Sequence, residues 1–207
     1  MKRNSILIVA ALAVVLFFIG FVTENYVLRM IAKPIPLLVF LSLLKPVTAY
    51  RKLIFAGLSF SILGDLLLES SPDMFIFGLL AFLTAQIAYI IAFTKRSHQT
   101  PIISAIILLV FGAGIYWVLY PGLHDMAIPV LVYLLVIITM AWRAIAQGKF
   151  DKYAIYAVIG SFFFMFSDSL IALDKFYMVV PYSRWMIMLS YWTAQSFIFY
   201  SAYRSSE

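Results

Sequence analysis

A succession of long apolar segments, separated by short polar turns, is the feature of this sequence that most restricts its fold. A helix needs roughly 20 apolar residues to cross about 30 Å of hydrocarbon, and eight segments come close to that length. They cover approximately residues 5–23, 29–44, 52–69, 74–93, 101–120, 126–144, 152–173 and 184–203. No soluble domain fits between them. The sequence therefore predicts an all-α integral membrane protein, with eight transmembrane helices in a single transmembrane domain over residues 1–207.

Composition and charge agree with a membrane protein. Of the 207 residues, 65% are hydrophobic and 12% charged, against about 45–50% and 25% in soluble domains. The basic residues lie in short clusters between apolar segments, not in one patch, so we expect no nucleic-acid partner despite the net charge of +6. Over alternate turns, eleven Lys and Arg residues fall on one side and four on the other, which predicts an N-in, C-in orientation. We expect a multi-pass protein of the cell membrane if bacterial, or of an endomembrane if eukaryotic.

Short motifs recur four segments apart, which indicates an internal duplication. The second segment contains IPLLVFL and the sixth IPVLVYL, while TAQ occurs in the fourth segment and again in the eighth. The third and seventh segments carry Gly, Phe and Asp at identical spacing, as Gly57, Phe60 and Asp65 and as Gly160, Phe163 and Asp168. Membrane folds are often built from such repeats. We predict a parallel 4+4 repeat, with halves at residues 1–96 and 97–207.

Asp65 and Asp168 are the candidate catalytic residues. A carboxylate inside the bilayer costs roughly 2.5 to 3.5 kcal/mol on insertion scales and usually faces a bundle interior or a watery cavity. At 1.5 Å per residue, the two lie roughly 21 and 24 Å along their helices from the cytoplasmic side, toward the outer leaflet. Each could instead satisfy a local structural need, such as a bond to a serine or lysine of a neighbouring helix. Their matched depth favours one shared functional site.

Other polar residues are candidates for substrate binding, each with a structural alternative. They are Lys33, Ser61, Gln86, Tyr89, Ser167, Arg184, Tyr191 and Gln195. Lys33 could pair with a carboxylate or a phosphate, or extend its ammonium to the interface. The glutamines could orient a water or hold helices together, and serines often bond carbonyls of their own helix. The tyrosines could equally be interfacial anchors.

We expect no metal and no cofactor. His98 and His124 lie in turns on opposite faces of the membrane and cannot share a metal ion. The chain has no cysteine, which excludes disulfides and thiolate nucleophiles. It also lacks a zinc ligand set, a P-loop, a GxSxG motif and a dinucleotide-binding loop.

Five stretches together resemble the YhhN family of eight-span membrane proteins, whose animal members are lysoplasmalogenases. They are KPIPLLVFL, AGLSFSILGDLLL, GLLAFLTAQIAYIIAF, GSFFFMFSDSLIAL and YWTAQSFIF. The resemblance covers the second to fourth and the seventh and eighth segments, in order. The family often has His where this chain has Gln86, so the resemblance does not make that position a proton carrier here. Some bacterial members lack the second aspartate, whereas this chain keeps both.

The resemblance implies hydrolysis of the sn-1 vinyl ether of a lysoplasmalogen, which yields a fatty aldehyde and glycerophosphocholine or glycerophosphoethanolamine. A vinyl ether opens when an acid protonates its β-carbon, and water then attacks the oxocarbenium ion. Two carboxyls close together would share one proton, so one could act as the acid while the other activates water or stabilises the cation. The sequence does not assign these two roles.

This function carries further expectations about partners. The substrate would be a lysophospholipid taken from the membrane lipid, and no obligate protein partner is inferred. We expect its phosphate near Lys33 or Arg184 and its tail along Phe60, Phe163 and Phe164. The alternative function is a proton- or cation-coupled transporter with an intramembrane Asp pair, because duplicated helices and buried carboxylates are expected there too. A third reading is a membrane protein in which the aspartates only pack helices.

Overall fold

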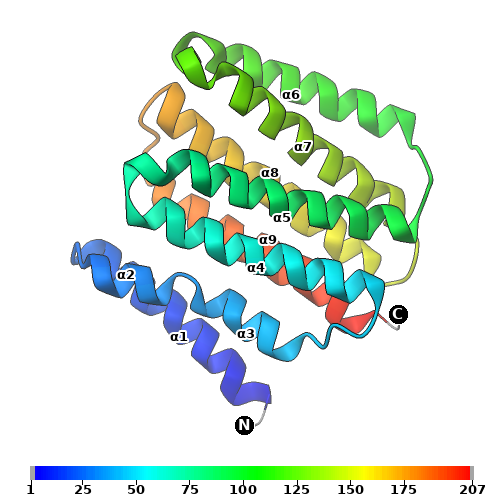
Figure 1. Cartoon of the computed structure of the whole chain (residues 1–207), viewed down its shortest axis with the longest axis horizontal. Helices are drawn as coiled ribbons and strands as arrows, with labels where there is room; N and C mark the ends of the chain where they lie inside the picture. Colours follow the sequence, from blue (N-terminus) through cyan, green and yellow to red (C-terminus); the bar gives the residue numbers. More distant parts are fainter. Residues whose placement is uncertain (1–2, 206–207) are drawn as a thin grey trace.

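A computed structural model describes residues 3–205, and all regular secondary structure within that range is helical (Figure 1). The α-helices are α1 (Arg3–Val22), α2 (Tyr26–Ala32), α3 (Ile35–Leu43), α4 (Ala49–Ser70), α5 (Phe75–Arg96), α6 (Ile102–Leu123), α7 (Ala127–Gln147), α8 (Ala154–Phe176) and α9 (Ser183–Arg204). Short 3₁₀ turns at Pro72–Met74 and His124–Met126 precede α5 and α7. Each of the eight predicted segments is therefore helical, with ends that differ from the prediction by a few residues.

The second predicted segment lies within one helical stretch, Tyr26–Leu43, but a turn divides this stretch into α2 and α3. Lys33 and Pro34 separate the two pieces, and Pro36 follows within the first turn of α3. Neither proline has an N–H to donate, so the regular ladder of helical hydrogen bonds cannot continue through this point. The break leaves Lys33 at the end of the short helix α2, and its side chain is only 9% exposed.

Five helical stretches of the described chain are long and apolar enough to cross a membrane. They are Tyr26–Leu43, Ala49–Ser70, Pro72–Arg96, Ile102–Gln147 and Ala154–Phe176, of which the fourth contains both α6 and α7. Ile8–Val22 forms a shorter apolar helix. These stretches identify an integral, multi-pass membrane protein.

The helices form a bundle in which the α4–α5 and α8–α9 hairpins are central (Figure 1). Helices α6 and α7 pack on one side of these hairpins, and α1 to α3 pack on the other. The turns after α4, α6 and α8 lie at one end of the bundle, which we call the cavity end. Helix α1 begins and α9 ends at the opposite end (Figure 1).

Glycines let the two central hairpins close tightly at corresponding points. A Cβ atom at Gly57 of α4 would lie 2.1 Å from the Tyr89 ring of α5. At Gly160 of α8, a Cβ would lie 2.7 Å from the Ala194 carbonyl oxygen and 2.8 Å from Ile198 of α9. A side chain at either glycine would push the paired helices apart, and with them the polar groups farther along α4 and α8.

Candidate active site

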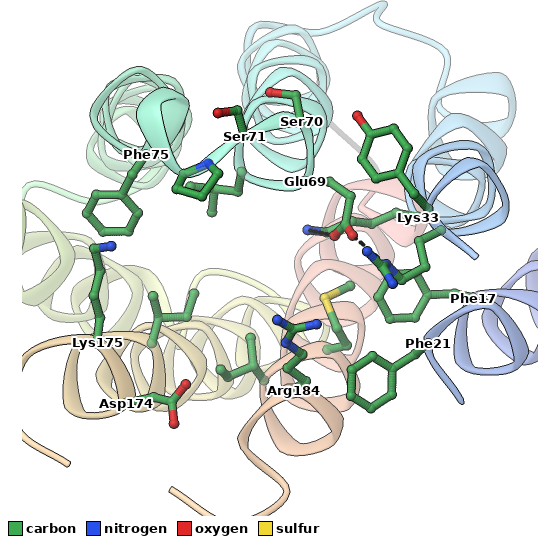
Figure 2. A pocket seen from close by; sticks show the side chains of 17 residues that line it. Phe17, Phe21, Lys33, Glu69, Ser70, Ser71, Phe75, Asp174, Lys175 and Arg184 are labelled. Carbon is green, nitrogen blue, oxygen red and sulfur yellow. Dashed lines mark hydrogen bonds and ion pairs between the residues drawn. The ribbon is translucent and has the colours of Figure 1, made fainter. Parts of the chain in front are cut away.

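A cavity of about 540 Å³ opens at the cavity end, between α1, α2, α4, α8 and α9 (Figure 2). Its charged lining residues are Arg29, Lys33, Glu69, Asp174, Lys175 and Arg184. Four are cationic and two acidic, which leaves a net formal charge of +2. The remaining wall is mostly aromatic and aliphatic. We call this space the cationic cavity.

The four cations of the cationic cavity differ in how far their charge is already neutralised. Arg29 and Lys33 both bind Glu69, with N···O distances of 2.7 and 3.2 Å. The Arg184 guanidinium points into the cavity in Figure 2 and lies 5.3 Å from the centre of the Phe21 ring. The Lys175 ammonium lies 4.2 Å from the Phe75 ring. Within residues 3–205, neither Arg184 nor Lys175 forms an ion pair, so their charge is available to an anionic ligand.

Asp168 of α8 lies beneath this cavity and is half-buried. The Tyr133 hydroxyl donates to its Oδ2 atom at 2.5 Å, and Gln86 Nε2 donates to the same atom at 3.2 Å. Gln86 also donates to the Tyr133 hydroxyl at 2.7 Å. The other oxygen of Asp168, Oδ1, accepts no hydrogen bond from the described part of the chain. One carboxyl oxygen is thus fixed and the other is left for a ligand.

Asp168 also borders open space on two sides. It lines a cavity of about 50 Å³ with Tyr133 and Phe82, and a second of about 40 Å³ with Tyr133 and Met165. The first shares Leu68, Phe75 and Ile171 with the cationic cavity, so the two spaces adjoin. A ligand in the cationic cavity therefore needs to pass only these side chains to meet the Asp168 carboxyl.

Asp65 of α4 has a different environment. It is 2% exposed and lines none of these three cavities. The Tyr191 hydroxyl donates to its Oδ2 atom at 2.8 Å. The Tyr191 ring in turn packs edge-on against Phe82 and Phe164, with centroids 5.7 and 5.9 Å apart. Asp65 is therefore enclosed by aromatic side chains.

Both aspartates nevertheless lie at the same depth below the cationic cavity. Leu68 and Ile171 each follow an aspartate by three residues, and both line the cavity. Three residues are about one helical turn, so each carboxyl lies roughly one turn beneath the cavity floor. Among the described residues, no single side chain hydrogen-bonds to both carboxyls.

Tyr133 was missed by the sequence reasoning, although a signal for it was present. The repeated motifs IPLLVFL and IPVLVYL differ at two positions, and one of these puts Tyr133 where the first motif has Phe40. The added hydroxyl is the group that binds Asp168. The signal in the sequence was this hydroxyl group, at a repeat position that is apolar in the first motif.

The other predicted binding residues lie in three different places. Lys33 and Arg184 line the cationic cavity. Ser61, Tyr89 and Gln195 instead bond one another in a fully buried cluster: Tyr89 donates to Gln195 Oε1 at 2.8 Å, and Gln195 Nε2 donates to Ser61 at 2.9 Å. The Ser167 hydroxyl donates to a backbone carbonyl of α9 at 3.1 Å.

The three phenylalanines expected along the substrate tail do not line one channel in the structure. Phe60 and Phe163 are 40% and 39% exposed on the outside of the bundle, whereas Phe164 is fully buried in the core. Phe60 and Phe163 line none of the cavities described above.

Within residues 3–205, no three His, Cys, Asp or Glu side chains gather closely enough to hold a metal ion.

Comparison with known proteins identifies relatives over most of the chain. The model of the YhhN family matches residues 25–202. Lysoplasmalogenase TMEM86B of Homo sapiens is 34% identical over 166 residues, covering 80% of this chain and 70% of that protein. Lysoplasmalogenase TMEM86A of Bos taurus is 36% identical over 161 residues, 74% of this chain and 66% of that protein. No solved structure matches the chain. The protein belongs to the YhhN family.

Proposed function

We propose that this protein is a lysoplasmalogenase-like hydrolase, which cleaves the vinyl ether of a lysoplasmalogen to a fatty aldehyde and a glycerophospho-alcohol. Relatives that are named lysoplasmalogenase and 34–36% identical support this reaction. The observation that carries the proposal is the position of Asp168, whose Oδ1 atom is unbonded by residues 3–205, beneath a cavity with net positive charge. A lysolipid needs both features, because its head carries a phosphate and its scissile bond lies close to that head.

The cationic cavity is the proposed site of the phosphate. Arg184 and Lys175 offer charge that no described carboxylate neutralises, while Arg29 and Lys33 would share theirs between Glu69 and the phosphate. Charge-assisted hydrogen bonds to phosphate oxygens are the stronger kind in proteins. A phosphate held here would place the vinyl ether near the floor at Leu68 and Ile171.

Asp168 is the proposed general acid, because the slow step in opening a vinyl ether is proton transfer to carbon and the acid must touch that carbon. Its Oδ1 proton moves to the β-carbon, and the ether oxygen then shares a lone pair to form the oxocarbenium ion. Water attacks the cationic carbon and returns a proton to Asp168. The hemiacetal collapses as its hydroxyl proton passes to the departing glycerol oxygen, which leaves the aldehyde.

Asp65 is the proposed counter-charge. Its carboxylate, held by the Tyr191 hydroxyl beneath the same floor, stabilises the oxocarbenium ion without contacting it. The field of a fixed charge in a water-poor site is a large source of transition-state stabilisation. The two carboxyls thus divide the work as glycosidase carboxyls do.

The architecture proposed for the whole protein is a bundle of eight transmembrane helices with a 4+4 repeat and with both termini on the inner side of the membrane. Corresponding glycines, Gly57 and Gly160, contact the next helix in each half. The two TAQ glutamines also reach across between halves: Gln86 bonds Asp168, and Gln195 bonds Ser61. Such exchange is expected when two similar halves pack about a pseudo-two-fold axis.

Incubation of the purified protein with lysoplasmalogen in detergent tests the function. Release of fatty aldehyde is the expected result, and it needs no gradient. A transporter would give no aldehyde in detergent but would move protons or cations across sealed vesicles. That outcome would replace the hydrolase with the alternative function.

A further inference from the structure

The cavities beside Asp168 are too small for the hydrocarbon tail of a lysolipid. They measure about 50 and 40 Å³, and a single water occupies about 30 Å³ in the liquid. Neither space holds more than a few atoms. A long alkenyl chain whose first carbons lie at Asp168 must therefore continue somewhere else.

A groove between α6 and α7 offers that continuation. It has a volume of about 240 Å³ and an almost wholly apolar wall. It is lined by Leu109, Gly112, Ala113, Tyr116, Leu134 and Ile138, together with three neighbouring residues. Gly112 lets α6 and α7 meet at the base of the groove, since a Cβ there would lie 2.1 Å from Ile138 Cδ1. The groove opens toward the lipid-facing side, where Trp117 is 82% exposed.

The groove adjoins the candidate active site through one side chain. Leu134 lines the groove and also the cavity of about 40 Å³ that Asp168 and Tyr133 line. That cavity shares Tyr133 and Asp168 with the cavity of about 50 Å³, which in turn adjoins the cationic cavity. The four spaces therefore adjoin one after another through shared lining residues, from the cations past Asp168 to the surface of α6 and α7, and Leu134 lies between the last two.

The groove runs along the bundle in the direction expected for the tail of a lipid in one leaflet. Asp168 lies eight residues from the end of α8, or about 12 Å below the cavity end. Leu134 is seven residues into α7, at about 10 Å, and Leu109 is fourteen residues from the end of α6, at about 21 Å. The groove thus begins near Leu131, about 6 Å below the cavity end, passes the depth of the carboxyl and runs on toward the middle of the bundle, as a lipid tail runs inward from its head.

We propose that the groove between α6 and α7 is the binding site for the alkenyl chain of the lysolipid, which leaves the active site past Leu134. The proposal rests on the proposed function and adds where the substrate contacts the membrane. The tail remains partly in the bilayer, so only the head and the vinyl ether enter the protein. The other occupant to consider is an ordinary membrane lipid with no part in the reaction.

A chain-length comparison tests the proposal. Ala113→Phe fills the groove from its exposed rim, and Val110→Phe on the same helix, outside the groove, is the matched control. The substrates are a long-chain lysoplasmalogen and a vinyl ether analogue whose chain ends before Leu134. We expect Ala113→Phe to lower kcat/KM for the long chain at least about tenfold, which corresponds to about two buried methylene groups, chiefly through KM. The short chain and the Val110→Phe control should be unaffected.

The possible failures have different meanings. If Ala113→Phe leaves the ratio of long-chain to short-chain kcat/KM unchanged, the groove holds a bystander lipid and the proposal is overturned. If the wild-type protein hydrolyses neither substrate, the proposed function itself is wrong. A long-chain lysolipid with a photoreactive group at its tail provides a second measurement that does not depend on turnover. We expect it to label peptides of α6 and α7, and labelling of α4 or α8 alone would contradict the proposal.

Discussion

The surroundings of Asp65 and Asp168 differ although the two residues occupy corresponding positions. Each lies about one turn below the floor of the cationic cavity, and each accepts a hydrogen bond from a tyrosine. Asp65 is sealed in and receives one donor, whereas Asp168 borders two cavities and receives two donors on one oxygen. The two aspartates therefore share a depth, while their neighbours decide how accessible each carboxyl is.

The difference can be traced to a few residues that differ between the two hairpins. The Tyr191 hydroxyl binds Asp65, but Phe82, at the corresponding point of the other hairpin, has no hydroxyl to offer Asp168. Tyr133 of α7 supplies one from another direction. In the proposed repeat, two similar helices thus carry one half-buried and one fully buried carboxyl.

Asp168→Asn gives the largest expected effect. An amide cannot protonate the vinyl ether, so kcat should fall about a thousandfold or more, in the upper part of the range for general acid catalysis. Initial rates of aldehyde release measure this. Near-normal turnover would show that Asp168 is not the proton donor.

Asp65→Asn should have a smaller effect, about a hundredfold on kcat, because it removes a stabilising charge but not the proton donor. Single-substrate kinetics with both variants, side by side in the same detergent, give the ratio. If kcat falls more in Asp65→Asn than in Asp168→Asn, Asp65 would be the proton donor and Asp168 the counter-charge.

Tyr133→Phe should lower kcat about tenfold while KM stays near its wild-type value, because the carboxyl loses its positioning donor but the phosphate site is intact. Tyr153→Phe is the control, since that hydroxyl accepts a hydrogen bond from Arg204 at the opposite end of the bundle. Equal losses in both variants would indicate a general effect of removing a tyrosine hydroxyl, not the positioning of Asp168.

Lys33→Met should raise KM several-fold and change kcat less, because charge at the head group contributes mainly to ground-state binding. Lys95→Met, at the opposite end of the bundle, is the matched control. Loss of kcat with an unchanged KM would place Lys33 in the catalytic step.

Chelation should have the smallest effect, with no loss of activity. The proposed acid and counter-charge use protons and fixed charge, and two carboxylates without further ligands would hold Mg²⁺ or Ca²⁺ only weakly. The assay is repeated after dialysis against a chelator. Activity that disappears and returns with added divalent ion would require a metal-bound water mechanism.

The sequence predicted the helical segments well, because the length needed to cross a bilayer leaves little freedom in where a helix begins and ends. It did not predict the break at Lys33 and Pro34, where local backbone chemistry overrides the apolar pattern. It also placed Phe60 and Phe163 along a tail path when they lie on the outside. In a membrane protein the lipid-facing and core-facing sides are both apolar, so hydrophobic periodicity does not identify the face that points inward.

Candidate site residues were predicted unevenly for a related reason. A carboxyl in an apolar helix is visible in any sequence, so Asp65 and Asp168 stood out. Whether Gln86 bonds Asp168 while Gln195 bonds Ser61 depends on how the helices are rotated in the bundle. That rotation is set by contacts between distant segments, such as Gly57 with Tyr89, which no local pattern encodes.

The fate of the solvent proton tests the central claim most directly. The purified protein is incubated with lysoplasmalogen in deuterated water, the aldehyde is reduced at once to prevent later exchange, and its mass is measured. Protonation of the β-carbon by Asp168 predicts a single deuterium on the carbon next to the former carbonyl, and almost no product from Asp168→Asn. Aldehyde without deuterium, or labelled aldehyde formed equally fast by Asp168→Asn, would contradict the account.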